Sequence, residues 1–308
     1  MGKISFIKSD DRKYNIERCL SLIKSEIMAG LKNAKNVVIK PNCIVENGKL
    51  AVTSVEALDA VLEFIKPYVK GQITLAEGTG IGNTLTAFQN YDYFSLHEKY
   101  DLELVDLNED EFETIELIDK NGKPWQAQVA KTILNSDYLI SVSPMKTHNE
   151  VVYTGAIKNV AVGSLVRSIP TFSKTINKLK ESMGMPRNNK ALIHQGTKAI
   201  NHNIKTLSER LPLNLAVIDA YESMEGNGPV SGDLVATHFA LASSDSLGAD
   251  WLACLLMGID IKDVPYLSML IGENDNFESN YFVIGDEWKT QITKFKMHPN
   301  FEKMKKLQ

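Results

Sequence analysis

The chain has 308 residues, of which 44% are hydrophobic and 23% are charged, an ordinary composition for a globular protein with one large or two medium domains. Its net charge of −4 gives no global reason to expect nucleic acid or an anionic membrane as a partner. No uncharged apolar run approaches the roughly 18 residues of a membrane span, and the N-terminal residues lack the pattern of a signal peptide.

The three cysteines are far apart in the sequence, and none belongs to a CxxC pair. This spacing excludes a disulfide framework and a four-cysteine zinc or iron–sulfur site within the chain. We therefore expect a cytoplasmic location.

Strand-like and helix-like patterns alternate along most of the chain. Short apolar or alternating runs predict strands over residues 4–7, 37–39, 73–76, 102–107, 138–142, 213–218, 238–242 and 282–285. Apolar residues at helical spacing predict helices over 16–27, 55–65, 200–211 and 247–257, the second with Thr53 and Glu56 as a capping box. Residues 112–118 and 126–129 are predicted to pair as a hairpin around Asn121-Gly122.

This alternation predicts an α/β fold with a mostly parallel sheet, or sheets, and helices on both faces, in a Rossmann-like arrangement. We predict a core over residues 1–270, which either forms one body or two lobes that meet near 145–165 around a cleft. Residues 271–308 are predicted to be a C-terminal extension without a ferredoxin segment. The stretch 167–190 is the least core-like part and predicts a basic excursion over the surface.

Residues 141–164 contain the densest set of candidate functional groups. A buried strand is expected to break at Pro144, and it is followed by Lys146 and His148, which lie on one side of the chain wherever the backbone is extended. Lys158 follows after small residues that allow close backbone approach. We interpret this stretch as the wall of a site.

Polar residues also follow the other predicted strands. In an open parallel sheet, ligands bind outside the carboxyl ends of the strands. We therefore expect one cleft to collect the polar residues at these ends, which are Lys40, Asn42, Glu77, Lys146, His148 and Asp219.

The charges are unevenly distributed along the second half of the chain. Residues 131–210 contain twelve Lys or Arg against four Asp or Glu, whereas residues 212–261 contain seven acidic residues and no Lys or Arg. Two interpretations stay open. The two segments form complementary surfaces without a ligand, or they form a cleft with an anion-binding wall and a cation-binding wall.

Several side chains have chemistry that suits such a cleft. Lys146 and Lys158 can bind a carboxylate or phosphate, and Lys158, beside apolar residues, can have a lowered pKa suited to covalent chemistry. A lysine that extends to solvent is the competing interpretation. His148 and His194 lie in polar segments near lysines, where an imidazole serves as an acid or base or as a metal ligand.

The acidic run from Asp219 to Glu225 has two interpretations, a site for a hard cation and a solvated loop. The three glycines after Glu77 have neither of the phosphate-loop spacings, which favours a turn that directs the Glu77 carboxylate towards the cleft.

A set of ordered motifs resembles the family named domain of unknown function 362, over roughly residues 3–270. The motifs are Lys40-Pro41-Asn42, Ala76-Glu77-Gly78, Lys146-x-His148, Gly155-Ala156-x-Lys158-Asn159, His194, Asp219 and Glu225-Gly226-x-Gly228-Pro229. Many members of that family resemble proteins with an appended ferredoxin-type iron–sulfur segment. This chain lacks such a segment, so no iron–sulfur cluster is expected.

The chain is also distantly similar to the nickel-pincer lactate racemase family. His148 and Lys158 have the spacing of that family's metal-binding histidine and cofactor-carrying lysine. The chain departs from the pattern in two places, since Ala156 replaces the second glycine before the lysine and Lys174 stands where a further nickel ligand is expected. Whether His194 replaces that ligand stays open. The resemblance implies a shared α/β fold and cleft more than a shared cofactor.

The leading hypothesis is an enzyme, racemase-like, isomerase-like or metal-dependent, that acts on a small anionic metabolite such as a hydroxy or keto acid. The candidate catalytic residues are His148, Lys158 and His194, and the candidate substrate-binding residues are Lys40, Asn42, Lys146 and Asn159. The candidate ligands of a divalent metal are His148, His194, Glu77, Asp219 and Glu225, and Lys158 is the candidate cofactor-binding residue. The cofactor itself is not identified by the sequence.

The alternative hypothesis is a non-catalytic protein that binds or matures a metal or cofactor for a partner. Nucleic-acid binding is the third hypothesis, and it is poorly supported because Phe172 is the one aromatic residue of the basic stretch. The sequence leaves open whether the protein forms a homo-oligomer or meets a redox or metabolic partner protein.

Overall fold

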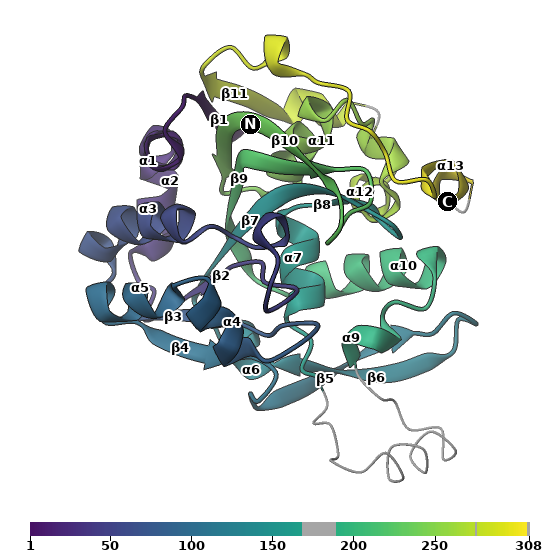
Figure 1. The fold of residues 1–308 in the computed structure, drawn as a ribbon, viewed down its shortest axis with the longest axis horizontal. Coiled ribbons are helices and arrows are strands. Elements are labelled where there is room, and N and C mark those ends of the chain that lie inside the picture. The colour runs from purple at the N-terminus through teal and green to yellow at the C-terminus, as the bar shows by residue number, and fades with distance from the viewer. Residues whose placement is uncertain (168–188, 275, 307–308) are drawn as a thin grey trace.

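The structure is a computed structural model that describes residues 1–167, 189–274 and 276–306 (Figure 1). Most of the predicted basic excursion, including Lys174 and Phe172, lies outside the described residues. Among the helices that are described, none has the length and apolar character needed to cross a bilayer.

A central sheet organises the molecule, with the strand order β11-β1-β10-β9-β7-β2-β3-β4 and with β8 paired to β7. Strand β10 is antiparallel to both β1 and β9, and β8 is antiparallel to β7, whereas the other neighbours are parallel. A separate hairpin is formed by β5 and β6. The strands are β1 (Gly2–Lys8), β2 (Asn36–Lys40), β3 (Gln72–Glu77), β4 (Glu103–Asp106), β5 (Phe112–Ile118), β6 (Pro124–Ala130), β7 (Tyr138–His148), β8 (Val152–Thr154), β9 (Leu213–Glu225), β10 (Asp233–Ser243) and β11 (Tyr281–Gly285).

Helices cover both faces of this sheet (Figure 1). Apolar residues of α1, α2, α3 and α5 belong to one hydrophobic core, and those of α7, α10, α11 and α12 belong to the other. The helices are α1 (Arg12–Leu22), α2 (Lys24–Leu31), α3 (Val55–Ile65), α4 (Thr84–Asn90), α5 (Tyr93–Tyr100), α6 (Lys131–Leu134), α7 (Ala156–Gly163), α9 (Asn189–Leu192), α10 (Thr197–Ser208), α11 (Ser246–Leu256), α12 (Pro265–Ile271) and α13 (Phe301–Lys305). The predicted fold class is therefore confirmed.

The period-two geometry of a strand explains why one sheet supports two cores. In β9, Leu215 and Val217 belong to the core with α1 and α3, whereas Ala216 and Ile218 belong to the core with α7 and α11. Successive side chains of a strand point to opposite faces, so a continuous apolar run fills both cores.

The strand ends differ from the prediction at two places. Strand β7 does not break at Pro144 but continues to His148, because Lys146–His148 pair with β8 after an irregularity in the pairing with β9. Strand β9 continues through Asp219 to Glu225, because β10 pairs with it along that length. The acidic run is therefore part of a strand and not a loop.

The helix starts also differ in detail. The single helix predicted over 16–27 is two helices, α1 and α2, which meet at Ile23. The residue that caps α3 is Ser54, which accepts a hydrogen bond from the Glu56 amide. Thr53, predicted for this role, instead donates to the Val142 carbonyl and accepts from the Asn42 amide. Its hydroxyl thus connects the segment after β2 to the middle of β7.

Strand β11, from the predicted C-terminal extension, lies parallel to β1 at the edge of the sheet. The division into 1–270 and 271–308 stays a prediction.

Candidate functional site

A cavity of about 100 Å³ lies at the carboxyl ends of β2, β3 and β7, beside α7. The chain runs from β2 to β3 and β4 on one side and from β7 to β9 on the other, so the strand order reverses between β2 and β7. Ligands of open α/β sheets bind at such a reversal. The cavity is lined by Lys40, Asn42, Cys43, Glu77, His148, Lys158, Asn159, Lys190 and His194, among others.

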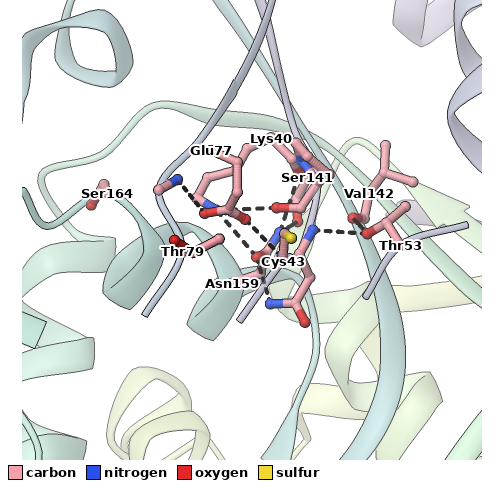
Figure 2. A network of polar contacts seen from close by, with 12 residues as sticks. Lys40, Cys43, Thr53, Glu77, Thr79, Ser141, Val142, Asn159 and Ser164 are labelled. Atoms are coloured by element: carbon pink, nitrogen blue, oxygen red, sulfur yellow. Dashed lines mark hydrogen bonds and ion pairs between the residues drawn. The ribbon is translucent and has the colours of Figure 1, made fainter. Parts of the chain in front are cut away.

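Lys40 and Glu77 form a buried ion pair where β2 and β3 end (Figure 2). Lys40 Nζ lies 2.8 Å from Glu77 Oε2, and both side chains are almost fully buried. Glu77 also accepts hydrogen bonds from the amides of Cys43, at 2.9 Å, and Gly78, at 2.7 Å. These contacts satisfy the carboxylate within the protein, as a buried charge requires.

Asn159 connects this pair to the neighbouring strands (Figure 2). Its amide nitrogen donates to the Lys40 carbonyl at 3.2 Å and to Ser141 Oγ at 3.0 Å, and its oxygen accepts from Asn42 at 3.1 Å. Asn42 in turn accepts from Lys146 Nζ at 2.5 Å. The result is a continuous polar network from the cavity into the core.

Lys146 lies behind the cavity wall and does not line the cavity. Its ammonium also donates to the Ala51 carbonyl at 3.1 Å. Burial, together with the positive charge of Lys158, lowers the pKa of Lys146 to about 7. The residue supports Asn42 and has no direct access to a ligand.

Lys158 differs from the other buried lysines because its ammonium has no hydrogen-bond or ion-pair partner among the described residues. Its side chain lines the cavity from α7 and is 5% exposed. Burial lowers the pKa of Lys158 to about 8, with the Glu150 carboxylate opposing this shift and the Lys40 charge adding to it. An unpaired cation thus faces the cavity.

The position of α7 is fixed by Asp250, a fully buried residue of α11. Its carboxylate accepts from the amides of Ala156, at 2.8 Å, and Ile157, at 3.0 Å, which start α7, and from Tyr153 Oη at 3.0 Å. Gly155 is required just before the helix, because a Cβ there would overlap the Tyr153 hydroxyl and the Asp250 carboxylate. Burial raises the pKa of Asp250 to about 6.

A second, apolar cavity of about 110 Å³ lies on the opposite face of α7. Its lining includes Ile157, Val160 and Ala161 of α7, together with Leu247 of α11 and Leu270 of α12.

His148 and His194 stack in the cavity wall, with ring centroids 6.3 Å apart. His148 Nδ1 accepts a hydrogen bond from the Glu150 amide at 3.0 Å, so the proton of the neutral ring is on Nε2. His194 Nδ1 lies 2.5 Å from the Lys190 carbonyl oxygen, which can only accept, so Nδ1 carries a proton and, in the neutral ring, Nε2 carries none.

We assign both rings as neutral, with opposite tautomers, because the pKa of each is lowered from its ordinary value. Burial, followed by the positive charge of Lys158, lowers the pKa of His148 well below its ordinary value. The same two causes lower the pKa of His194, although that residue is exposed to solvent. One ring offers a hydrogen-bond donor and the other an acceptor.

Asp219 and Glu225 are not brought into the cavity. Asp219 Oδ2 lies 3.4 Å from Arg12 Nε, and Glu225 accepts from the Lys296 amide at 2.8 Å. The two carboxylates that were expected to form a cation-binding wall therefore bind the Arg12 guanidinium and the Lys296 amide instead.

The five metal candidates are consequently not assembled into one centre. Within residues 1–167, 189–274 and 276–306, no group of three or more His, Cys, Asp and Glu side chains is arranged to hold a metal ion. Glu77, the carboxylate that shares the cavity lining with the two histidines, is already paired with Lys40. The donor set therefore does not fit the metal centre that the racemase resemblance implies.

Lys190 was missed by the sequence interpretation, which placed it at the end of a surface excursion. Its side chain is 7% exposed, lines the cavity, and donates to the Gly78 carbonyl and to Asn108 Oδ1. Helix α9 has only four residues, too few for a periodic pattern to indicate which side is buried. Asp250 was also missed, because the sequence around this acidic residue does not indicate that it binds the start of α7, more than 90 residues earlier in the chain.

Comparisons with known proteins place the chain among α/β proteins. A profile of the family described as DUF362, domain of unknown function, matches residues 37–255. A thylakoid-associated protein of Synechocystis sp. is 20% identical over 240 residues, which cover 77% of this chain and 68% of that protein.

Two solved structures are also similar. The lactate racemase apoprotein of Thermoanaerobacterium thermosaccharolyticum has a TM-score of 0.50 and 17% identity, and the match covers 84% of this chain and 58% of that one. A Thermotoga maritima protein has a TM-score of 0.47 and 13% identity, over 80% of this chain and 59% of that one. This chain thus spans less than two thirds of either protein, and the first likeness bears on the fold alone.

Proposed function

This chain belongs to the DUF362 family, a family of unknown function, and we propose from the contents of its cavity that it is an enzyme for a small carboxylic acid. In this proposal the cavity binds a hydroxy or keto acid, and the two histidines transfer protons on it. The observation that carries the proposal is the unpartnered ammonium of Lys158, a buried residue, in one cavity with two histidines of opposite tautomer.

Lys158 supports an anionic ligand. A charged group that is removed from water without a partner destabilises the folded protein, and a ligand of opposite charge relieves that penalty. The Lys40–Glu77 pair is already neutral, so it adds no competing demand for a counter-ion. A carboxylate next to Lys158 Nζ supplies the counter-ion that this ammonium lacks among the described residues.

The volume of the cavity supports a small ligand. At about 100 Å³ it is smaller than the ~150 Å³ apolar cavity that binds benzene in an engineered protein. An acid of roughly three or four carbon atoms matches this size.

The histidines support proton transfer as the reaction class. His148 Nε2–H can donate a hydrogen bond to a ligand oxygen, while His194 Nε2 can accept a proton from it or from the neighbouring carbon. Because both rings are neutral, neither repels the Lys158 cation. This arrangement fits racemisation or keto–enol interconversion of a carboxylic acid.

Isothermal titration calorimetry with lactate and pyruvate tests the binding step. NMR in D₂O tests proton transfer, through deuterium incorporation at the carbon next to the carboxyl or carbonyl group. We expect Lys158→Met to abolish binding, and His194→Gln to retain binding while deuterium incorporation falls at least about tenfold.

Lys120→Met is the matched control, because Lys120 is exposed in the β5–β6 turn. It should leave both measurements unchanged. Binding without deuterium incorporation in the wild-type protein would contradict the enzymatic proposal and favour the non-catalytic binding alternative.

A further inference from the structure

We propose that the Lys158 amine forms an imine with the carbonyl group of a small keto acid in this cavity. The inference rests on the proposed function in one respect, because the ligand enters the same cavity. It adds a covalent step and a narrower class of substrate. Under this inference a carbonyl-bearing acid reacts, whereas the corresponding hydroxy acid only binds.

The first support is the contrast between Lys158 and the other buried lysines. Lys40 is held by Glu77, Lys146 by Asn42 and the Ala51 carbonyl, and Lys190 by Asn108 and the Gly78 carbonyl. Each of these hydrogen bonds must break before the nitrogen can attack a carbonyl carbon. Lys158 Nζ has no such restraint among the described residues.

The second support is the fraction of neutral amine, since only the neutral form is a nucleophile. With its pKa lowered to about 8, Lys158 is neutral in on the order of a tenth of the molecules at pH 7. A lysine with an ordinary pKa is neutral in less than about one molecule in a thousand at that pH.

The third support is the place of the two histidines in the same lining. His194 Nε2 is available to take a proton from the Lys158 ammonium, and His148 Nε2–H is available to stabilise the oxygen of the carbonyl. A nucleophile, a base and a hydrogen-bond donor thus line one cavity, the combination that such reactions require.

The reaction balances without an oxidant or reductant. The amine lone pair forms the C–N bond while the carbonyl π electrons move to oxygen, and loss of that oxygen as water leaves a C=N bond. Two of the three ammonium protons end on the water, by way of His194, and the third stays on the imine nitrogen. The positive charge therefore stays beside the ligand carboxylate, as in the non-covalent complex.

The imine also gives the histidines a chemical role. A protonated imine withdraws electrons and acidifies the C–H bonds of the adjacent carbon. His194 Nε2 can then remove such a proton, which is the proton transfer of the proposed function.

The test is reductive trapping with pyruvate and sodium cyanoborohydride, followed by intact mass and peptide mapping of the full chain. We expect one reduced pyruvate adduct per chain, located at Lys158 and absent from Lys146 and Lys190. The trapping rate should rise between pH 6.5 and 9 with a midpoint near 8, and lactate should slow trapping by competition without forming an adduct.

Lys158→Arg is the matched variant, since it keeps the positive charge but remains protonated and forms no imine. It should lose the adduct entirely, and peptide mapping of the wild-type protein gives the same answer should this variant not fold. Calorimetric binding of pyruvate without an adduct at Lys158 overturns the imine and leaves the proposed function standing. An adduct spread evenly over surface lysines also overturns the imine, and the absence of both binding and adduct overturns the two proposals together.

Discussion

Two buried lysines of one cavity, Lys158 and Lys40, have opposite relations to stability because only one of them has a counter-ion. Lys40 is paired with Glu77, whereas Lys158 faces the cavity without a partner among the described residues. Replacing Lys158 by methionine removes an unpaired charge, whereas replacing Lys40 by methionine breaks an ion pair. The two substitutions should therefore change stability in opposite directions, as expected where a functional site gives up stability.

Lys158→Met is expected to raise the free energy of unfolding by about 1–3 kcal/mol, because it replaces a desolvated, unpaired cation by an apolar side chain of similar length. Urea unfolding at pH 7 measures the change. The folded-state pKa of about 8 lies below the ordinary value of 10.5, so between these values the unfolded chain binds more protons and this residue makes the wild-type protein more stable as pH rises. The advantage of Lys158→Met should therefore shrink from pH 8 to pH 10.5, and an advantage that is constant with pH would contradict the buried cation.

Lys40→Met is expected to lower the free energy of unfolding by about 3–5 kcal/mol, because it leaves the Glu77 carboxylate buried without its counter-ion. The same urea titration measures it. The double variant Lys40→Met with Glu77→Gln is the control, and it should recover part of the loss because the stranded charge is removed. An equal loss in the double variant would indicate that packing, and not charge, holds the pair.

At the scale of elements, helix α7 connects stability to the site because it carries both Lys158 and Asn159. Asp250→Ala is expected to lower the free energy of unfolding by about 2–4 kcal/mol, since three buried donors lose their acceptor. It should also weaken pyruvate binding at least about tenfold, because the start of α7 is no longer held. Urea unfolding and calorimetry measure the two effects.

Asp245→Ala is the matched control for this prediction. Asp245 caps α11 through the amides of Leu247 and Gly248 and accepts from Tyr281 Oη, and within the described residues its hydrogen bonds do not involve α7. Its loss should cost about 0.5–2 kcal/mol of stability without a change in pyruvate affinity. Equal loss of affinity in both variants would show that general destabilisation, and not the position of α7, weakens binding.

The elements that the sequence predicts well are those whose pattern is local. Apolar runs gave β1, β2 and β3, and the Asn121-Gly122 turn gave the hairpin of β5 and β6. The continuation of β7 beyond Pro144 could not be predicted, because it depends on pairing with β8 and β9. Local sequence does not contain that pairing.

In the site, too, local sequence predicts some residues, whereas others are placed by contacts between distant parts of the chain. Lys40, Glu77 and His148 could be placed in one cavity because they end strands of a parallel sheet. Lys190 and Gly78 are 112 residues apart, and no spacing rule relates them. The roles predicted for these side chains, and a location in the cytoplasm, stay predictions.

At the scale of the whole molecule, one sheet belongs to both hydrophobic cores, so the chain is expected to unfold as a single cooperative unit. Trp125, Trp251 and Trp288 all pack in or against the core with α7 and α11, whereas far-UV circular dichroism reports on helices of both faces. Urea transitions followed by tryptophan fluorescence and by circular dichroism should therefore coincide. Two separate midpoints would instead support two independently stable lobes.

The second cavity, behind α7, bears on how firmly this helix is held in different directions. Along its axis the helix is anchored at its first turn by Asp250, which accepts two hydrogen bonds from it, through the Ala156 and Ile157 amides. Across its axis, Val160 and Ala161 border the second cavity of about 110 Å³, so this face of the helix is less completely packed than a filled core. We therefore expect the wall that carries Lys158 to shift sideways more readily than along the helix axis, which would let the cavity accommodate ligands of different breadth.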